Sequence, residues 1–258
     1  MIKVAASDFD GTLFRGGDVN PADLEAIQTW RRRGYKFGLA TGRDLSMILP
    51  ELTAFQIPFD FLVLSSGAAI YDQDLRLIGV ETVSPDDAQE VLEHPAGRRS
   101  QYFALSKDDK THLDVFTREP AWLGPFRHNL IPFDTSLGIA MTGIQQISLE
   151  YADAREARRS LEELTRDFAG VLDAHLAGGF CVQLTQSGVD KASGLARLCR
   201  LRGWPDNDLI IAGDSDNDLA MFRRFRGYAM TSAPKALQSL AFRVVESPAV
   251  MLWEEMRH

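Results

Sequence analysis

The chain has 258 residues, and its 28 basic and 36 acidic side chains give a formal net charge of −8. This acidic balance argues against a general affinity for nucleic acid or for anionic membrane surfaces. The length suits one large domain or two modest ones. No apolar run is long enough to cross a bilayer, and the N-terminus leads straight into a strand without a secretory signal. Two cysteines far apart predict neither a metal site nor a disulfide. A cytoplasmic location is therefore expected, and the oligomeric state stays open between a monomer and a homodimer.

The first predicted strand, Ile2–Ala6, runs into a pair of aspartates. Asp8 and Asp10 occupy positions i and i+2 of an extended chain, so their side chains point the same way. Like charges this close favour a bound cation or a shared proton. Gly11 allows a sharp turn, and the Thr12 hydroxyl can bond back to the backbone. The alternative is a strand that is merely capped by turn-forming residues.

Strands and helices alternate through the next part of the chain. A helix begins at Asn20-Pro21, and the strand Tyr35–Ala40 then runs into Thr41-Gly42-Arg43. The strand Phe61–Leu64 precedes a turn of small residues and a hairpin. This alternation predicts a parallel sheet covered by helices on both faces. Ligands bind such sheets at the carboxyl ends of the strands.

The pattern changes between about residues 81 and 186, which predicts a second domain inserted into the first. Residues 1–81 and 187–258 then form the core, and residues 82–186 form the insertion. Alternating apolar and polar residues in its strands predict a sheet with one open face. Its expected elements are a helix from Pro85, strands Gln101–Leu105 and His112–Phe116, a helix near Pro120–His128, a strand Gln146–Tyr151, a helix Asp153–Phe168, and strands Val171–His175 and Phe180–Thr185.

The core pattern resumes with Lys191 at a helix start and the apolar strand Leu209–Ala212. That strand ends in an acidic cluster, Asp214–Asp218, whose alternating aspartates mimic the start of a calcium-binding EF-hand loop. Such a loop needs Gly at its sixth position and Glu at its twelfth. Leu219 and Phe225 stand there, and a strand precedes the cluster where a helix would be needed, so calcium is excluded.

The segment Asp8-Phe9-Asp10-Gly11-Thr12 resembles the signature of the haloacid dehalogenase-like (HAD) phosphatase superfamily. Thr41 at a strand end, Lys191 at a helix start and the cluster at Asp214 match the three further motifs in order, and four motifs in register are a specific signal. The element order of the insertion is similar to the cap of the Cof-type, subclass IIB branch. The resemblance implies an α/β fold: a doubly wound parallel-sheet, Rossmann-like core with an inserted α+β cap domain.

The resemblance also implies a mechanism of phosphoryl transfer. Asp8 is expected to attack phosphorus and form an aspartyl-phosphate, while Asp10 acts as general acid and then as general base. The carboxylates of Asp8 and Asp214, with the backbone carbonyl of Asp10, are expected to hold Mg²⁺. Lys191 completes the expected catalytic set by neutralising phosphoryl oxygens.

Four residues are expected to bind the phosphoryl group of the substrate: Thr41, Gly42, Lys191 and Asn217. Arg43 is expected either to touch the substrate or to anchor its loop. Asp218 is expected to position Lys191 or a metal-bound water, although for Asn217 and Asp218 a structural capping role is nearly as consistent with the sequence.

The function that the resemblance implies is a Mg²⁺-dependent phosphatase of small phosphorylated metabolites, with sugar phosphates favoured. A phosphotransferase or phosphomutase using the same Asp8 is the alternative, followed by a non-catalytic sugar-phosphate-binding protein. Ser66 and Ser232 stand where the family usually has Asn, which affects substrate preference rather than chemistry. The specific substrate stays open; Lys107–Lys110 and Phe180–Thr185 are the candidate specificity segments.

Overall fold

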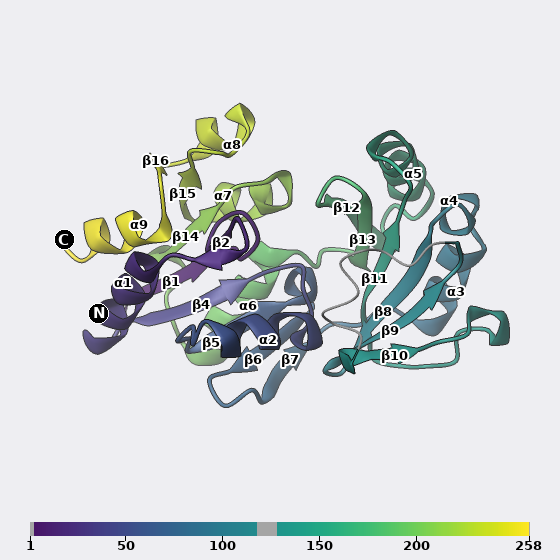
Figure 1. Cartoon of the computed structure of the whole chain (residues 1–258), viewed down its shortest axis with the longest axis horizontal. Coiled ribbons are helices and arrows are strands. Elements are labelled where there is room, and N and C mark those ends of the chain that lie inside the picture. The colour runs from purple at the N-terminus through teal and green to yellow at the C-terminus, as the bar shows by residue number, and fades with distance from the viewer. Residues whose placement is uncertain (1–2, 118–127, 258) are drawn as a thin grey trace. The chain divides into compact units, whose positions relative to one another are not determined.

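The computed structural model describes residues 3–117 and 128–257, and the chain divides into two compact units (Figure 1). Unit 1 comprises Met1–Thr41, Glu51–Gly79 and Asp190–His258, and unit 2 comprises Gly42–Pro50 and Val80–Val189. The predicted α/β fold with a parallel-sheet core and an α+β insertion is confirmed. The helix expected near Pro120–His128 falls almost wholly outside the described residues.

The described part of unit 1 is built on one large sheet in which neighbouring strands run parallel from β16 to β5. β6 then pairs antiparallel with β5. In spatial order the strands are β16 (Arg243–Val245), β15 (Arg226–Met230), β14 (Leu209–Gly213), β1 (Val4–Ser7), β4 (Lys36–Ala40), β5 (Phe61–Leu64), β6 (Ala69–Asp72) and β7 (Leu77–Val80). Strands β14, β1 and β5 are buried along their whole length, as expected for a parallel sheet covered on both faces.

Helices of unit 1 pack against this sheet through their apolar residues. On one side, the amide of Ala249 at the start of α9 donates to the Asp23 carboxylate of α1 at 2.8 Å. On the other, leucines and alanines of α6 share a core with strand residues and with Met221 and Phe222 of α7. The helices are α1 (Pro21–Arg32), α6 (Lys191–Arg202), α7 (Leu219–Arg224), α8 (Lys235–Leu240) and α9 (Pro248–Glu255). The 3₁₀ turns are η1 (Ser65–Gly67), η4 (Asp206–Asp208) and η5 (Asp216–Asp218). Strands β2 (Phe14–Arg15) and β3 (Asp18–Val19) form a small hairpin.

Unit 2 contains a mostly antiparallel sheet with helices on one face. Its strands, in spatial order, are β10 (Leu130–Pro132), β9 (Lys110–Val115), β8 (Tyr102–Lys107), β11 (Ile144–Glu150), β13 (Cys181–Gln186) and β12 (Leu172–Ala177). Its helices are α3 (Pro85–Glu93), α4 (Pro95–Arg98) and α5 (Ala154–Asp167), with a 3₁₀ turn η3 (Thr135–Leu137). One set of alternating strand residues packs with these helices in a core, which leaves the other set on the opposite face.

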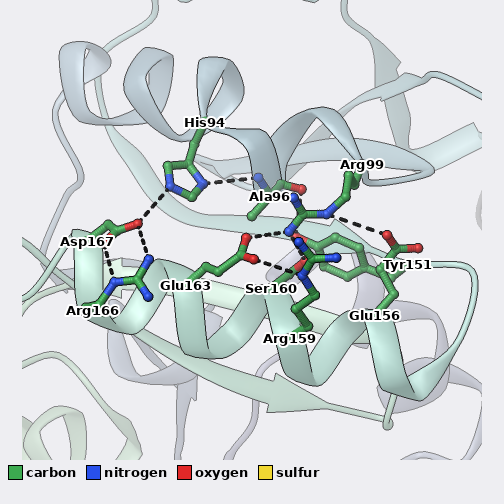
Figure 2. A network of polar contacts seen from close by, with 10 residues as sticks. All are labelled: His94, Ala96, Arg99, Tyr151, Glu156, Arg159, Ser160, Glu163, Arg166 and Asp167. Carbon is green, nitrogen blue, oxygen red and sulfur yellow. Dashed lines mark hydrogen bonds and ion pairs between the residues drawn. The ribbon is translucent and has the colours of Figure 1, made fainter.

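A polar network fastens α4 to α5 on the helical side of this sheet (Figure 2). Arg99 donates to Ser160 Oγ at 3.1 Å and also pairs with Glu163. His94 Nε2 lies 3.2 Å from the Asp167 carboxylate. The Glu163 carboxylate is paired with the Arg99 guanidinium, and the Asp167 carboxylate contacts the titratable His94 ring. This network therefore serves the packing of the helices and leaves little uncompensated charge for a ligand.

The grouping of Gly42–Pro50 with unit 2 was not expected from the sequence. Asp44, which is buried, accepts a hydrogen bond from Ser106 Oγ of β8 at 2.9 Å and another from the Thr111 hydroxyl of β9. The segment also opens a helix, α2 (Leu45–Ala54), that the sequence pattern did not reveal because Pro50 interrupts it.

No helix among the described residues is long and apolar enough to cross a membrane.

Candidate active site

The site is built at one edge of the unit 1 sheet, where β1 and β14 lie side by side. In their parallel register Ser7 pairs with Ala212, and the Asp8 amide donates to the Ala212 carbonyl at 2.9 Å. Asp8 follows β1 and Asp214 follows β14, so the two carboxylates meet at the carboxyl ends of neighbouring strands. This is the edge at which ligands bind open α/β sheets.

Lys191 is the cation of the site, and its side chain is 2% exposed. Its Nζ donates to Asp8 Oδ1 at 2.7 Å, to Asp218 Oδ1 at 2.7 Å and to Asn217 Oδ1 at 3.0 Å. All three donor positions of the ammonium are therefore used. The Asp190 and Ser193 side chains cap the start of α6 and fix the helix end from which Lys191 projects.

Two glycines that the sequence analysis did not single out let α6 approach the sheet. A Cβ on Gly67, whose φ is +102°, would lie 2.0 Å from the Asp190 carbonyl oxygen. A Cβ on Gly194 would lie 2.7 Å from Val63 Cγ1. Because such contacts are far below van der Waals distance, only glycine permits the close packing that brings Lys191 to Asp8.

Asp218 holds the turn that follows β14. Its Oδ2 accepts hydrogen bonds from the amides of Asp214 at 2.9 Å and of Ser215 at 3.1 Å, while its Oδ1 binds Lys191. Both oxygens are thus occupied: one contacts Lys191, and the other caps the turn, so the contacts of both roles considered for Asp218 are present.

The loop after β1 contacts Asp214 directly. Thr12 Oγ1 donates to Asp214 Oδ1 at 2.6 Å, so the expectation that this hydroxyl bonds the backbone is wrong. Gly11 adopts φ +84°, and a Cβ there would lie 2.3 Å from Asp214 Oδ2. The turn that Gly11 allows therefore brings the Thr12 hydroxyl within reach of a carboxylate 202 residues away. Asp10, which directly precedes Gly11, is exposed.

The other predicted phosphate-binding residues follow β4. Thr41 is 2% exposed, its amide donates to the Val63 carbonyl at 2.9 Å, and its carbonyl accepts from the Ser66 amide at 3.0 Å. The next two residues, Gly42 and Arg43, belong to unit 2. Arg43 Nη1 donates to the Met47 carbonyl at 3.0 Å, which is the loop-anchoring contact among the two roles considered for it.

Negative charge is in excess at this site. Asp8, Asp214 and Asp218 each place a carboxylate oxygen within 4.8 Å of the others. Burial raises the pKa of Asp8, and the Asp218 charge raises it further against the opposing effect of Lys191. Burial also raises the pKa of Asp214. Although burial alone would lower it, the pKa of Lys191 is raised by the charges of Asp218 and Asp8. The cluster suits a hard divalent cation.

The chain is similar to known proteins over almost its whole length. The family model described as haloacid dehalogenase-like hydrolase matches residues 5–249. The chain is 26% identical to the 5-amino-6-(5-phospho-D-ribitylamino)uracil phosphatase YbjI of Escherichia coli (strain K12), over 93% of this chain and 89% of that protein. It is 24% identical to a phosphoglycolate phosphatase of Pyrobaculum aerophilum, over 98% and 93% respectively.

The fold is likewise that of solved members of the group. The structure of the HAD subclass IIB sugar phosphatase BT4131 superposes with a TM-score of 0.79 at 20% identity and covers 99% of this chain and 98% of that chain. The fold inferred from the motifs is thereby confirmed.

Proposed function

Since the chain belongs to the haloacid dehalogenase-like hydrolases and is a phosphoric monoester hydrolase, we propose that it is a Mg²⁺-dependent phosphatase of small phosphorylated metabolites. The Lys191 ammonium held between Asp8 and Asp218 carries this proposal. A buried ammonium fixed beside a carboxylate nucleophile can neutralise the oxygens of an incoming phosphoryl group without any rearrangement of the site.

In the proposed mechanism, the Asp8 carboxylate attacks phosphorus and the bond to the ester oxygen breaks. Asp10 donates a proton to the departing alkoxide. It then takes a proton from the water that attacks the aspartyl-phosphate, which releases inorganic phosphate and restores Asp8. Thr41, Gly42 and Asn217 would bind phosphoryl oxygens.

The residues fit a magnesium ion, because the crowded carboxylates of Asp8 and Asp214 offer hard oxygen ligands and carry uncompensated negative charge. Asp8, Asp214 and the Asp10 carbonyl would hold it. When bound, the ion supplies positive charge against the phosphoryl oxygens. Asp218 is the less suitable ligand, since both of its oxygens already accept hydrogen bonds.

We assign the chemistry to residues 1–81 and 187–258 and the choice of substrate to residues 82–186. The relatives' names span a ribitylaminouracil phosphate, phosphoglycolate and sugar phosphates. Among these we favour sugar or sugar-alcohol phosphates. The cytoplasmic location and the monomer or homodimer state stay predictions from the sequence.

The test is phosphate release from a panel of phosphate esters, with Mg²⁺ and with a chelator, and with a free sugar present as a possible acceptor. We expect Mg²⁺-dependent release of inorganic phosphate. Transfer to the sugar in place of release would favour a phosphotransferase, and the absence of turnover with every ester would refute the proposal.

A further inference from the structure

A pocket of about 400 Å³ lies within unit 2, on the face of the sheet opposite the helices. The segment that forms one of its walls begins at Gly42, immediately after Thr41 in the sequence. Its wall and floor residues come from that segment, from β8, β9, β11 and β13, from the end of β12, and from the turn between β12 and β13. The sheet face alone would be open, and the segment Gly42–Pro50 turns it into a pocket.

The strand register sets the chemistry of the floor in rows. Glu150 pairs with Tyr102 on one side and with Cys181 on the other, which makes the first row. Ser148 lies between Ala104 and Gln183 in the second row, and Gln146 pairs with Ser106 in the third. Glu150 follows Gln146 by four positions along β11, which is about 13 Å of extended strand.

The first and third rows differ in their charged groups. At the third row, the Asp44 carboxylate accepts hydrogen bonds from the hydroxyls of Ser46, Ser106 and Thr111. These neutral donors stabilise its charge but do not cancel it. Glu150 adds a second carboxylate at the first row, next to Phe180, a residue that is 49% exposed.

Charge and hydrogen-bonding groups therefore define what the pocket can accept. Its charged lining residues are Arg43, Asp44 and Glu150. Arg43 stands two positions after Thr41 in the sequence and donates to the Met47 carbonyl. The floor between the first and third rows presents amides and hydroxyls. A carboxylate reaching the first row would meet Glu150, whereas a hydroxyl there could donate to it.

We propose that this pocket receives the leaving group of the phosphate ester, an inference that rests on the proposed function. The leaving group is an extended, uncharged, hydroxyl-rich chain or sugar. Glu150 rejects leaving groups that end in a carboxylate. Phe180 offers an apolar surface for the carbon skeleton of such a chain. The candidate segment Phe180–Thr185 thus contributes to the pocket through Phe180, Cys181 and Gln183. The other candidate, Lys107–Lys110, forms the turn between β8 and β9, and its residues are not among those that line the pocket.

The decisive comparison uses two esters of equal length, sorbitol 6-phosphate and 6-phosphogluconate, which differ at the end remote from phosphate by a hydroxymethyl group against a carboxylate. With the wild-type protein and Mg²⁺, we expect kcat/KM for sorbitol 6-phosphate to exceed that for 6-phosphogluconate by about tenfold or more. Equal values, or a preference for 6-phosphogluconate, would overturn the inference without any variant being needed.

Glu150→Gln keeps the shape of the side chain and removes its charge. We expect this variant to lower the ratio of kcat/KM for sorbitol 6-phosphate to kcat/KM for 6-phosphogluconate by about fivefold or more. Most of the change should come from a higher kcat/KM for 6-phosphogluconate. Glu162→Gln, an exposed change on α5, is the matched control and should leave the ratio unchanged. An unaltered ratio in Glu150→Gln, with a melting temperature like that of the wild type, would refute the role of Glu150.

Turnover of p-nitrophenyl phosphate separates this inference from the proposed function. Release of p-nitrophenol with no preference between the two six-carbon esters would refute the pocket assignment and leave the phosphatase proposal standing. No release from any of the three esters would refute the phosphatase proposal itself.

Discussion

At the scale of single residues, the site depends on one ammonium shared by two buried carboxylates. Lys191 neutralises part of the charge of Asp8 and Asp218, and the excess remains with Asp214 close by. Removing a buried partner from such a cluster is costly when it leaves the opposite charge alone, and much less costly when a balanced pair remains. Asp8 is the member whose charge can be removed while Lys191 keeps Asp218.

Asp8→Asn should therefore abolish turnover without loss of the fold. The amide cannot attack phosphorus, and we expect kcat to fall by about 10³-fold or more. In metal-free buffer its melting temperature should equal or exceed that of the wild type, because repulsion from Asp214 and Asp218 is relieved. Phosphate release and thermal unfolding measure the two effects, with the exposed Asp109→Asn as control. Near wild-type turnover would rule out Asp8 as the nucleophile.

At the scale of elements, the approach of α6 to the sheet determines where Lys191 lies. Gly194→Ala places a methyl group 2.7 Å from Val63 Cγ1 and 2.8 Å from the Gly67 backbone, so the helix must shift. We expect a loss of about 1–3 kcal/mol in unfolding free energy, despite the better helix propensity of Ala, together with a lower kcat. Urea unfolding and phosphate release test this. Arg200→Ala, exposed on the same helix, should change neither; a Gly194→Ala protein of wild-type activity would contradict the packing argument.

A second element-scale prediction concerns Asp60, whose side-chain carboxylate accepts hydrogen bonds from the end of α1 and from the start of β4. Burial opposes its ionisation, but hydrogen bonds from Arg31, the Phe37 amide and Lys36 lower the pKa of this carboxyl below its usual value. A depressed pKa contributes stability that is present above the unfolded value of about 3.9 and is lost as the pH falls through the folded value.

Asp60→Asn should accordingly cost about 1–3 kcal/mol of unfolding free energy at pH 7. The difference from the wild type should persist to about pH 5 and narrow below about pH 4. Urea unfolding across this range measures it. Asp74→Asn removes an exposed ion pair and should have almost no effect. A difference that stays constant down to pH 3 would show that charge is not the cause.

At the scale of the whole molecule, a metal that binds only the folded chain must stabilise it. We expect Mg²⁺ to raise the melting temperature, by an amount equivalent to about 2.7 kcal/mol at one hundred times its dissociation constant. A chelator should abolish activity, and Asp214→Asn should remove most of the thermal shift. Differential scanning calorimetry with and without Mg²⁺ gives the result. An equal shift in the variant would place the ion elsewhere.

Most elements of the core sheet, and the positions of the candidate catalytic residues at their ends, could be predicted from the sequence. Strand and helix periodicities are local, and Asp8, Thr41, Lys191 and Asp214 each stand directly at the end or start of such an element. Because parallel strands present their carboxyl ends at one edge, the pattern already predicted that these residues meet there. The structure brings Lys191 to Asp8 across 183 residues, as that pattern requires.

Contacts that depend on side-chain packing and on strand register could not be predicted from the sequence. The Thr12 hydroxyl reaches Asp214 only because Gly11 turns the loop toward β14. Asp44 groups Gly42–Pro50 with unit 2 through hydroxyls on two strands that lie far away in the sequence. The row of Tyr102, Glu150 and Cys181 exists only in the register of three strands. The hydrophobic periodicity within one element does not reveal such contacts, because each depends on which residues of distant elements the fold brings opposite one another.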